Sequence, residues 1–184
     1  MRCFVAVELP AEVRRELGDL TRGLCRYLPE ARWVRPELMH LTLAFLGEVA
    51  DDLPGRLRAP LAATGARHPA FNARLGGLGA FPGPGRARVV WVGMEAGADE
   101  LGALQKDVVG ALVPAGYVPE RRPFSPHLTL GRLRTPADAG AAVRRHFSGR
   151  GFRVERFVLL RSVLRPDGPE YTELESFALK APAA

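Results

Sequence analysis

The sequence is short of cysteine, histidine and lysine, and it contains no long hydrophobic run. Two of its 184 residues are cysteines and four are histidines. Cys3 and Cys25 have neither the spacing of metal ligands nor that of a CxxC redox pair, and we expect no disulfide between them. No stretch reaches the roughly 18 to 20 apolar residues of a transmembrane helix. The opening MRCFVAVELP is too short in its apolar part for a signal peptide, so we expect a cytoplasmic protein with no membrane partner.

Length and composition are those of an ordinary globular domain. The 184 residues are 47% hydrophobic and 25% charged, which predicts one domain with a real core and excludes disordered and fibrous classes. The formal net charge of +6 favours polyanionic partners. However, all basic residues except Lys106 and Lys180 are arginines, and such a ratio also fits a GC-rich coding bias. The charge is compatible with an RNA or nucleotide substrate, and a solvated arginine-rich surface explains it equally well.

The pattern of apolar residues predicts strands and helices in alternation. Proline at position 10 precedes a helical face made by Val13, Leu17, Leu20 and Leu24. Asp99 is a candidate N-cap for a second clear helix, which carries Leu101, Leu104, Val108 and Leu112. A weaker helix is expected at 53–65 and a further helix at 136–147. The expected strands are 3–8, 38–46, 71–80, 88–93, 127–133, 152–164 and 171–179.

The two halves of the chain repeat one plan. Both run strand, helix, strand, helix, strand, and the third element of each contains the tetrapeptide His-Leu-Thr-Leu. The two histidines, His40 and His127, lie 87 residues apart, while the first strands of the halves begin 85 residues apart. This near-constant offset indicates an internal duplication, with pseudo-repeats of about 1–86 and 87–184 in a single bilobal domain. We expect an α+β fold in which two antiparallel sheets with outer helices face each other across a central cleft.

Each tetrapeptide places an imidazole and a hydroxyl on one side of a strand. Because side chains alternate in a strand, His40 and Thr42 share a face, about 7 Å apart at the backbone, and Leu41 points to the other. The second copy repeats this with His127 and Thr129. The leucines then fix the register, since a slip of one residue would bury the histidine.

Two such strands facing each other suit displacement at phosphorus. One neutral histidine can take a proton from water while one protonated histidine gives a proton to the leaving oxygen. The threonine hydroxyls can donate hydrogen bonds to phosphate oxygens as negative charge develops. A lone His-x-Thr is usually structural, but two copies in one repeat frame favour catalysis. A metal site is not expected, because no HExxH, His/Cys cluster or acidic pair accompanies either motif.

At these residues the chain resembles the two-histidine (2H) phosphoesterase superfamily, specifically the RNA 2′,3′-cyclic phosphodiesterases, once called 2′-5′ RNA ligases. The likeness covers the opening strand, the settings of both motifs at 32–49 and 123–133, and the late segment GPEYTEL at 168–174. It implies a bilobal fold with one motif in each lobe and metal-independent hydrolysis of RNA terminal 2′,3′-cyclic phosphates to 2′-phosphates, without a cofactor.

The resemblance also implies the roles of the residues. His40 would be the proton donor, His127 the proton acceptor, and Thr42 and Thr129 the phosphate ligands. Reversal of the chemistry would give 2′-5′ RNA ligation as a side activity. The implied partner is RNA with a cyclic phosphate end, for example a tRNA fragment, bound by a monomer. Two alternatives stay open: a phosphodiesterase for small cyclic nucleotides or ADP-ribose cyclic phosphate, and a non-catalytic basic RNA-binding module.

Several other residues are weighed against these motifs. Arg132 has the wrong strand parity to face the cleft unless a β-bulge intervenes. The family often has an arginine at this position, which makes Arg132 a candidate contact for phosphate or RNA. Phe45 has the wrong parity too and is expected in the core. Packing or local roles are expected for the rest, namely Trp33, Phe124, His68, His146 and the glycines at 76–79.

Overall fold

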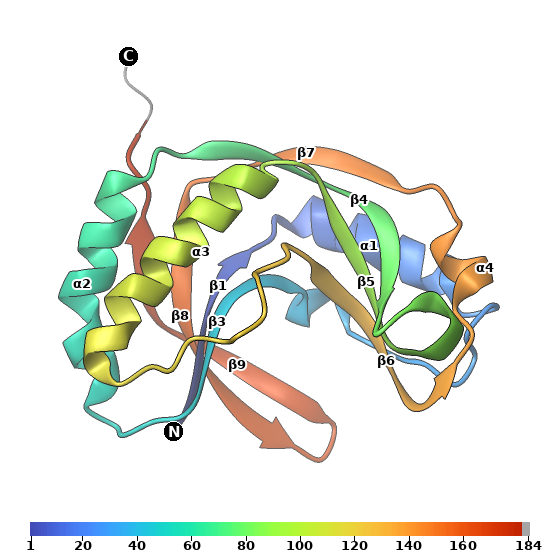
Figure 1. Cartoon of the computed structure of the whole chain (residues 1–184), viewed down its shortest axis with the longest axis horizontal. Coiled ribbons are helices and arrows are strands. Elements are labelled where there is room, and N and C mark those ends of the chain that lie inside the picture. The colour runs from blue at the N-terminus through green and yellow to red at the C-terminus, as the bar shows by residue number, and fades with distance from the viewer. Residues whose placement is uncertain (182–184) are drawn as a thin grey trace.

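Two antiparallel sheets form the centre of the molecule, which a computed structural model describes over residues 1–181 (Figure 1). The first sheet has the order β3-β1-β8-β9, and its strands are β1 (Arg2–Glu8), β3 (His40–Glu48), β8 (Arg156–Arg165) and β9 (Gly168–Ala178). The second has the order β2-β6-β5-β4-β7, and its strands are β2 (Arg32–Trp33), β4 (Phe71–Phe81), β5 (Ala87–Ala96), β6 (Leu128–Ala137) and β7 (Ser148–Val154).

The helices pack on the outside of the two sheets. They are α1 (Ala11–Leu24), α2 (Leu53–Arg67), α3 (Ala98–Leu112) and the single turn α4 (Gly140–Val143), with short 3-10 turns at Pro36–Leu38, Pro84–Arg86 and Val113–Ala115. Helices α2 and α3 contact each other; α2 also contacts β8 and β9, and α3 contacts β3. Helix α1 contacts β7, and α4 contacts β4. The expected α+β fold with two antiparallel sheets and outer helices is confirmed.

Both sheets use the same strand pairing around their motif. In the first sheet the motif strand β3 pairs with the opening strand β1, and in the second the motif strand β6 pairs with β5. Each sheet therefore carries one motif. Each sheet also draws on both halves of the sequence, because β4 joins the second sheet while β8 and β9 join the first. A lobe of the fold is thus not one contiguous half of the chain.

The leucines of the motifs anchor the two motif strands in the main core. Leu41 and Leu43 are 1% and 3% exposed, and Leu128 and Leu130 are 1% and 0% exposed. Burying a leucine side chain contributes about 1.5–3 kcal/mol, which holds each motif in register. The opposite face of the first sheet, which His40 and Thr42 share, carries a smaller cluster of Phe4, Ala6, Val158, Leu160 and Tyr171.

Three expectations about local structure are wrong. The helix expected at 136–147 is only the turn α4, because β6 continues to Ala137 and the chain then returns to pair with β4 through β7. The single strand expected at 152–164 is two strands that meet at Glu155. The N-cap of helix α3 is Gly97, which has φ 82°, and not Asp99. The Asp99 carboxylate lies in the first turn, where it interacts favourably with the positive end of the helix dipole.

Candidate active site

The two motif histidines are held by the same backbone contact. The Nδ1 of His40 lies 2.8 Å from the carbonyl oxygen of Leu38, and the Nδ1 of His127 lies 2.7 Å from that of Ser125. A carbonyl only accepts, so Nδ1 carries the proton in both rings. Nε2 then carries a lone pair and can accept a proton when the ring is neutral, and it carries a hydrogen that it can donate when the ring is charged. In each ring Nε2 is therefore the nitrogen that can gain or lose a proton while the Nδ1 contact is kept.

A β-bulge lies at the last residue of each motif. In β3 the partners of Val5 and Ala6 are Ala44 and Thr42, so Leu43 is an extra residue. In β6 the partners of Val90 and Trp91 are Gly131 and Thr129, so Leu130 is the extra residue. A bulge of this kind reverses which face the following side chains point to. The two bulges lie 87 residues apart, as the histidines do.

The bulges bring two more side chains to the cleft. Arg132 is exposed and lines a cavity together with His40 and Thr129. Arg132 could face the cleft only if a β-bulge preceded it, and that bulge is present at Leu130. Phe45 occupies the equivalent position 87 residues earlier, and its side chain is 55% exposed on the wall of the same cavity. The expectation that Phe45 belongs to the core is therefore wrong, because the alternation of strand positions is interrupted at Leu43.

The cavity measures about 540 Å³ and is lined by residues of both sheets. It brings His40 of the first motif together with Thr129 of the second and with Arg132. Thr42 and His127 are not among its lining residues, although their strands β3 and β6 contact each other. One cavity thus joins the two sheets at the motifs and holds part of each.

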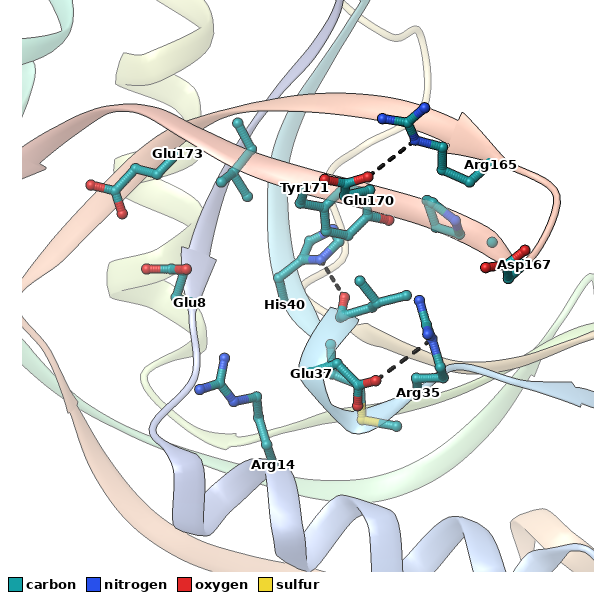
Figure 2. A pocket seen from close by; sticks show the side chains of 15 residues that line it. Glu8, Arg14, Arg35, Glu37, His40, Arg165, Asp167, Glu170, Tyr171 and Glu173 are labelled. Atoms are coloured by element: carbon teal, nitrogen blue, oxygen red, sulfur yellow. Dashed lines mark hydrogen bonds and ion pairs between the residues drawn. The ribbon is translucent and has the colours of Figure 1, made fainter.

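His40 lies between aromatic rings on the face of the first sheet. Its ring centroid is 4.8 Å from that of Phe4 and 5.4 Å from that of Tyr171, which meets it edge-on at 80°. Figure 2 shows His40 beside Tyr171, with the bond from its ring to the backbone of Leu38. Burial lowers the pKa of His40, and the bond to the Leu38 carbonyl opposes that shift in part. The free enzyme therefore favours a neutral His40 near pH 7.

His127 has an aromatic surround of its own on the second sheet. Its ring centroid is 5.1 Å from that of Phe81, which meets it edge-on at 87°, and 6.2 Å from that of Trp91. Trp91 itself lies over Gly79 on the neighbouring strand, where a Cβ would collide with the indole. The glycine at position 79 therefore allows close packing of the tryptophan.

The aromatic residues around both histidines were not among the predicted site residues. Tyr171 lies in the GPEYTEL segment, which was a signal for it, whereas nothing local marks Phe4, Phe81 or Trp91. Among the other weighed residues, Trp33 packs over Gly131 and also lines the cavity. Phe124 packs against the main core, as expected.

The two remaining histidines lie outside the cavity. His68 Nε2 is 2.9 Å from Asp107 Oδ2, a contact between the end of α2 and helix α3. His146 is exposed after α4. Within residues 1–181 no group of three or more His, Cys, Asp or Glu side chains could hold a metal ion. In the same part of the chain no helix has the length and apolar character to cross a membrane.

Comparisons with known proteins agree along the whole chain. The profile of the 2′-5′ RNA ligase superfamily matches residues 9–165. A Thermus thermophilus protein named RNA 2′,3′-cyclic phosphodiesterase is 39% identical, over 98% of this chain and 91% of its own. One of the same name from Archaeoglobus fulgidus is 34% identical, over 96% and 99%. The crystal structure of Escherichia coli LigT complexed with 3′-AMP matches with a TM-score of 0.80 and 32% identity, over 97% of both chains.

Proposed function

Because this chain belongs to the 2′-5′ RNA ligase superfamily, we propose that it hydrolyses RNA terminal 2′,3′-cyclic phosphates to 2′-phosphates. The observation that carries the proposal is the matched anchoring of His40 and His127, each with Nδ1 on a carbonyl and Nε2 left for proton transfer. The name shared by relatives that cover nearly the whole chain supports the substrate.

The two histidines divide the proton transfers of an in-line displacement. His127 Nε2 takes a proton from water, whose oxygen forms a new bond to phosphorus. The bond between phosphorus and the 3′ oxygen breaks, and His40 Nε2–H gives that oxygen its proton. The products are a 2′-phosphate and a free 3′-hydroxyl. This assignment of acid and base follows the family, since the two motifs are identical in sequence.

Three further side chains stabilise the phosphate. The hydroxyls of Thr42 and Thr129 donate hydrogen bonds to its oxygens as charge builds up in the transition state. The guanidinium of Arg132 binds the same anion; its exposure on the cavity wall beside Thr129 supports this role. Phe45 offers an exposed ring on the same wall for a nucleobase, which favours a nucleotide over a smaller phosphodiester.

Turnover of defined substrates tests the proposed activity. A short RNA with a 2′,3′-cyclic phosphate end should be opened with a higher kcat/KM than ADP-ribose cyclic phosphate or a free 2′,3′-cyclic mononucleotide. Faster turnover of either small substrate would favour the alternative phosphodiesterase. Binding of the RNA without any turnover would favour a non-catalytic RNA-binding module. Reverse 2′-5′ ligation is a side activity in this account, because water is the more abundant nucleophile.

The reaction should not need a metal ion. The two imidazoles supply the acid and the base, the threonine hydroxyls supply hydrogen bonds, and Arg132 supplies positive charge. Each requirement of the displacement is thus met by a protein group. Treatment with EDTA followed by removal of the chelate should leave kcat/KM unchanged. Strict dependence on added Mg²⁺, Mn²⁺ or Zn²⁺ would contradict the mechanism.

The pH dependence should identify the acid. As proton donor His40 must be charged, so activity falls as pH rises through its pKa. Burial lowers that pKa, which puts the alkaline limb of kcat/KM below about pH 6.5. A bound phosphate anion stabilises the charged ring, so the alkaline limb of kcat should lie at higher pH. His40→Ala should lose this alkaline limb in its residual activity; loss of the acidic limb would exchange the roles of the two histidines.

We also infer that the chain is one bilobal domain produced by duplication, with repeats of about 1–86 and 87–184. The bulges at Leu43 and Leu130 and the two Nδ1 contacts support this, since each pair is 87 residues apart. We expect the protein to act as a monomer on cytoplasmic RNA, including tRNA fragments.

A further inference from the structure

Two arginines face each other on neighbouring strands beside the motif of the second sheet. Arg32 of β2 is the direct cross-strand partner of Arg132 of β6, and both side chains are exposed. Like charges in this arrangement destabilise a sheet. The strand is held there by other contacts: Val34 donates a backbone hydrogen bond of 2.8 Å to Leu130, and Trp33 packs closely over Gly131. The fold thus keeps two cations side by side that do not stabilise it.

Neither arginine of this pair has a carboxylate partner among residues 1–181. Four arginines line the cavity, and Asp167 is the one acidic residue among the described residues of its wall. Arg35 lies 3.6 Å from Glu37, but Arg2, Arg32 and Arg132 form no salt bridge with any residue of 1–181. Their unbalanced positive charge is available to an anionic ligand.

The charge of this cluster reaches the site of proton transfer. Burial raises the pKa of Tyr171, and the positive charges of Arg132 and Arg2 oppose that rise, so both lie near the ring that packs against His40. Arg2 belongs to the first sheet and Arg132 to the second, so the cluster spans the cleft. A phosphate held here would be next to one held by His40 and Thr129.

A second cavity beside His40 has the opposite balance of charge. It measures about 420 Å³ and shares His40 and Tyr171 with the first (Figure 2). Three arginines line it, but so do five carboxylates, Glu8, Glu37, Asp167, Glu170 and Glu173. An RNA strand carries one negative charge per phosphate and is disfavoured on that side. The strand that leads to the reacting end must therefore leave through the arginine-lined cavity.

Resting on the proposed function, we propose that Arg32, with Arg2 across the cleft, binds the internucleotide phosphate that precedes the terminal cyclic phosphate. Arg132 then holds the reacting phosphate and its strand partner Arg32 holds the next one along the chain. The site would select the end of an RNA strand over a free cyclic mononucleotide, because only the strand supplies the second phosphate.

A comparison of one and two nucleotides tests this subsite. The substrates are a dinucleotide with a 2′,3′-cyclic phosphate end and the matching nucleoside 2′,3′-cyclic phosphate. In Arg32→Gln the ratio of their kcat/KM values should fall about tenfold, the effect of one charge-assisted hydrogen bond. Arg32→Lys should retain most of the ratio. Arg74→Gln, which removes an exposed arginine of β4 that does not line the cavity, should leave it unchanged.

Binding provides a readout that does not depend on catalysis. Calorimetry with a dinucleotide ending in a 2′-phosphate, and with the matching nucleoside 2′-phosphate, should show the same loss of preference in Arg32→Gln. An unchanged preference, or an equal loss on both ligands, would overturn the subsite. If the wild-type protein shows the binding preference but opens neither cyclic phosphate, the proposed function fails and the subsite stands.

Discussion

Replacing either His40 or His127 with alanine should lower kcat by about 10²–10⁴-fold, the usual contribution of one general acid or base. The double variant should lose little more than the worse single variant, because the two proton transfers belong to one displacement and residues that act as a unit are not additive. The measurement is single-turnover hydrolysis of a short RNA with a 2′,3′-cyclic phosphate end.

The control for these variants is another histidine of the same chain. His146→Ala removes an exposed imidazole outside the cavity and should keep wild-type kcat. Because His40 and His127 pack against aromatic rings, each variant should also be checked for folding by urea denaturation. Folded His40→Ala and His127→Ala proteins with unaltered activity would exclude the catalytic assignment of both motifs.

The second large effect should come from a threonine hydroxyl. Thr129→Val keeps the shape of the side chain and its preference for a strand but removes the hydroxyl that we propose donates to the phosphate. Loss of one donor to a developing oxyanion costs about 10²–10³ in kcat, and we expect a loss of that size. Thr42→Val should behave in the same way at the equivalent position of the first motif. The quantity to compare is kcat, because the hydrogen bond strengthens in the transition state.

Two further substitutions distinguish the loss of the hydroxyl from a disturbance of the fold. Thr129→Ser retains the donor and should recover most of the lost rate. Thr135→Val changes an exposed threonine of the same strand that does not line the cavity, and it should have no effect. A Thr129→Val protein that is folded and fully active would show that the hydroxyl donates nothing to the reacting phosphate.

The centre of the site could be predicted from the sequence because it depends on local rules. Alternation along a strand put His40 with Thr42 and put Leu41 in the core, and the structure buries that leucine at 1% exposure. The offset of 87 residues identified equivalent strands, and each pairs with the opening strand of its own half. These inferences needed only the period of a strand and the cost of exposing leucine.

The positions of Phe45 and Arg132 could be predicted only in part. The two-residue alternation of side chains along a strand does not show where a β-bulge interrupts it. One extra residue at Leu43 turns Phe45 outward, where simple alternation puts it in the core. The duplication held a signal that sequence reasoning could have used. Arg132 is 87 residues after Phe45, so an arginine expected at the cleft implies an exposed residue at the equivalent position of the first motif.

The surround of the histidines could not be predicted, because it depends on pairings between distant strands. Tyr171 reaches His40 from β9, and the intervening strands β1 and β8 lie between β9 and β3 in the sheet. The same holds for β4, which joins the second sheet, and β8, which joins the first. Which strands pair, and which lie at an edge, depends on the packing of the whole sheet. The periodic pattern of apolar residues within a strand does not indicate which other strands will lie beside it.

The most direct test of the central claim is the product of one defined RNA carrying a 2′,3′-cyclic phosphate end. The account predicts a single product with a 2′-phosphate and a free 3′-hydroxyl, formed in the presence of EDTA and incorporating one solvent oxygen at phosphorus. Digestion with a 3′-specific phosphatase, which would leave this product intact, distinguishes the two regioisomers. A 3′-phosphate product, or an RNA recovered with its cyclic end unopened, would contradict the account.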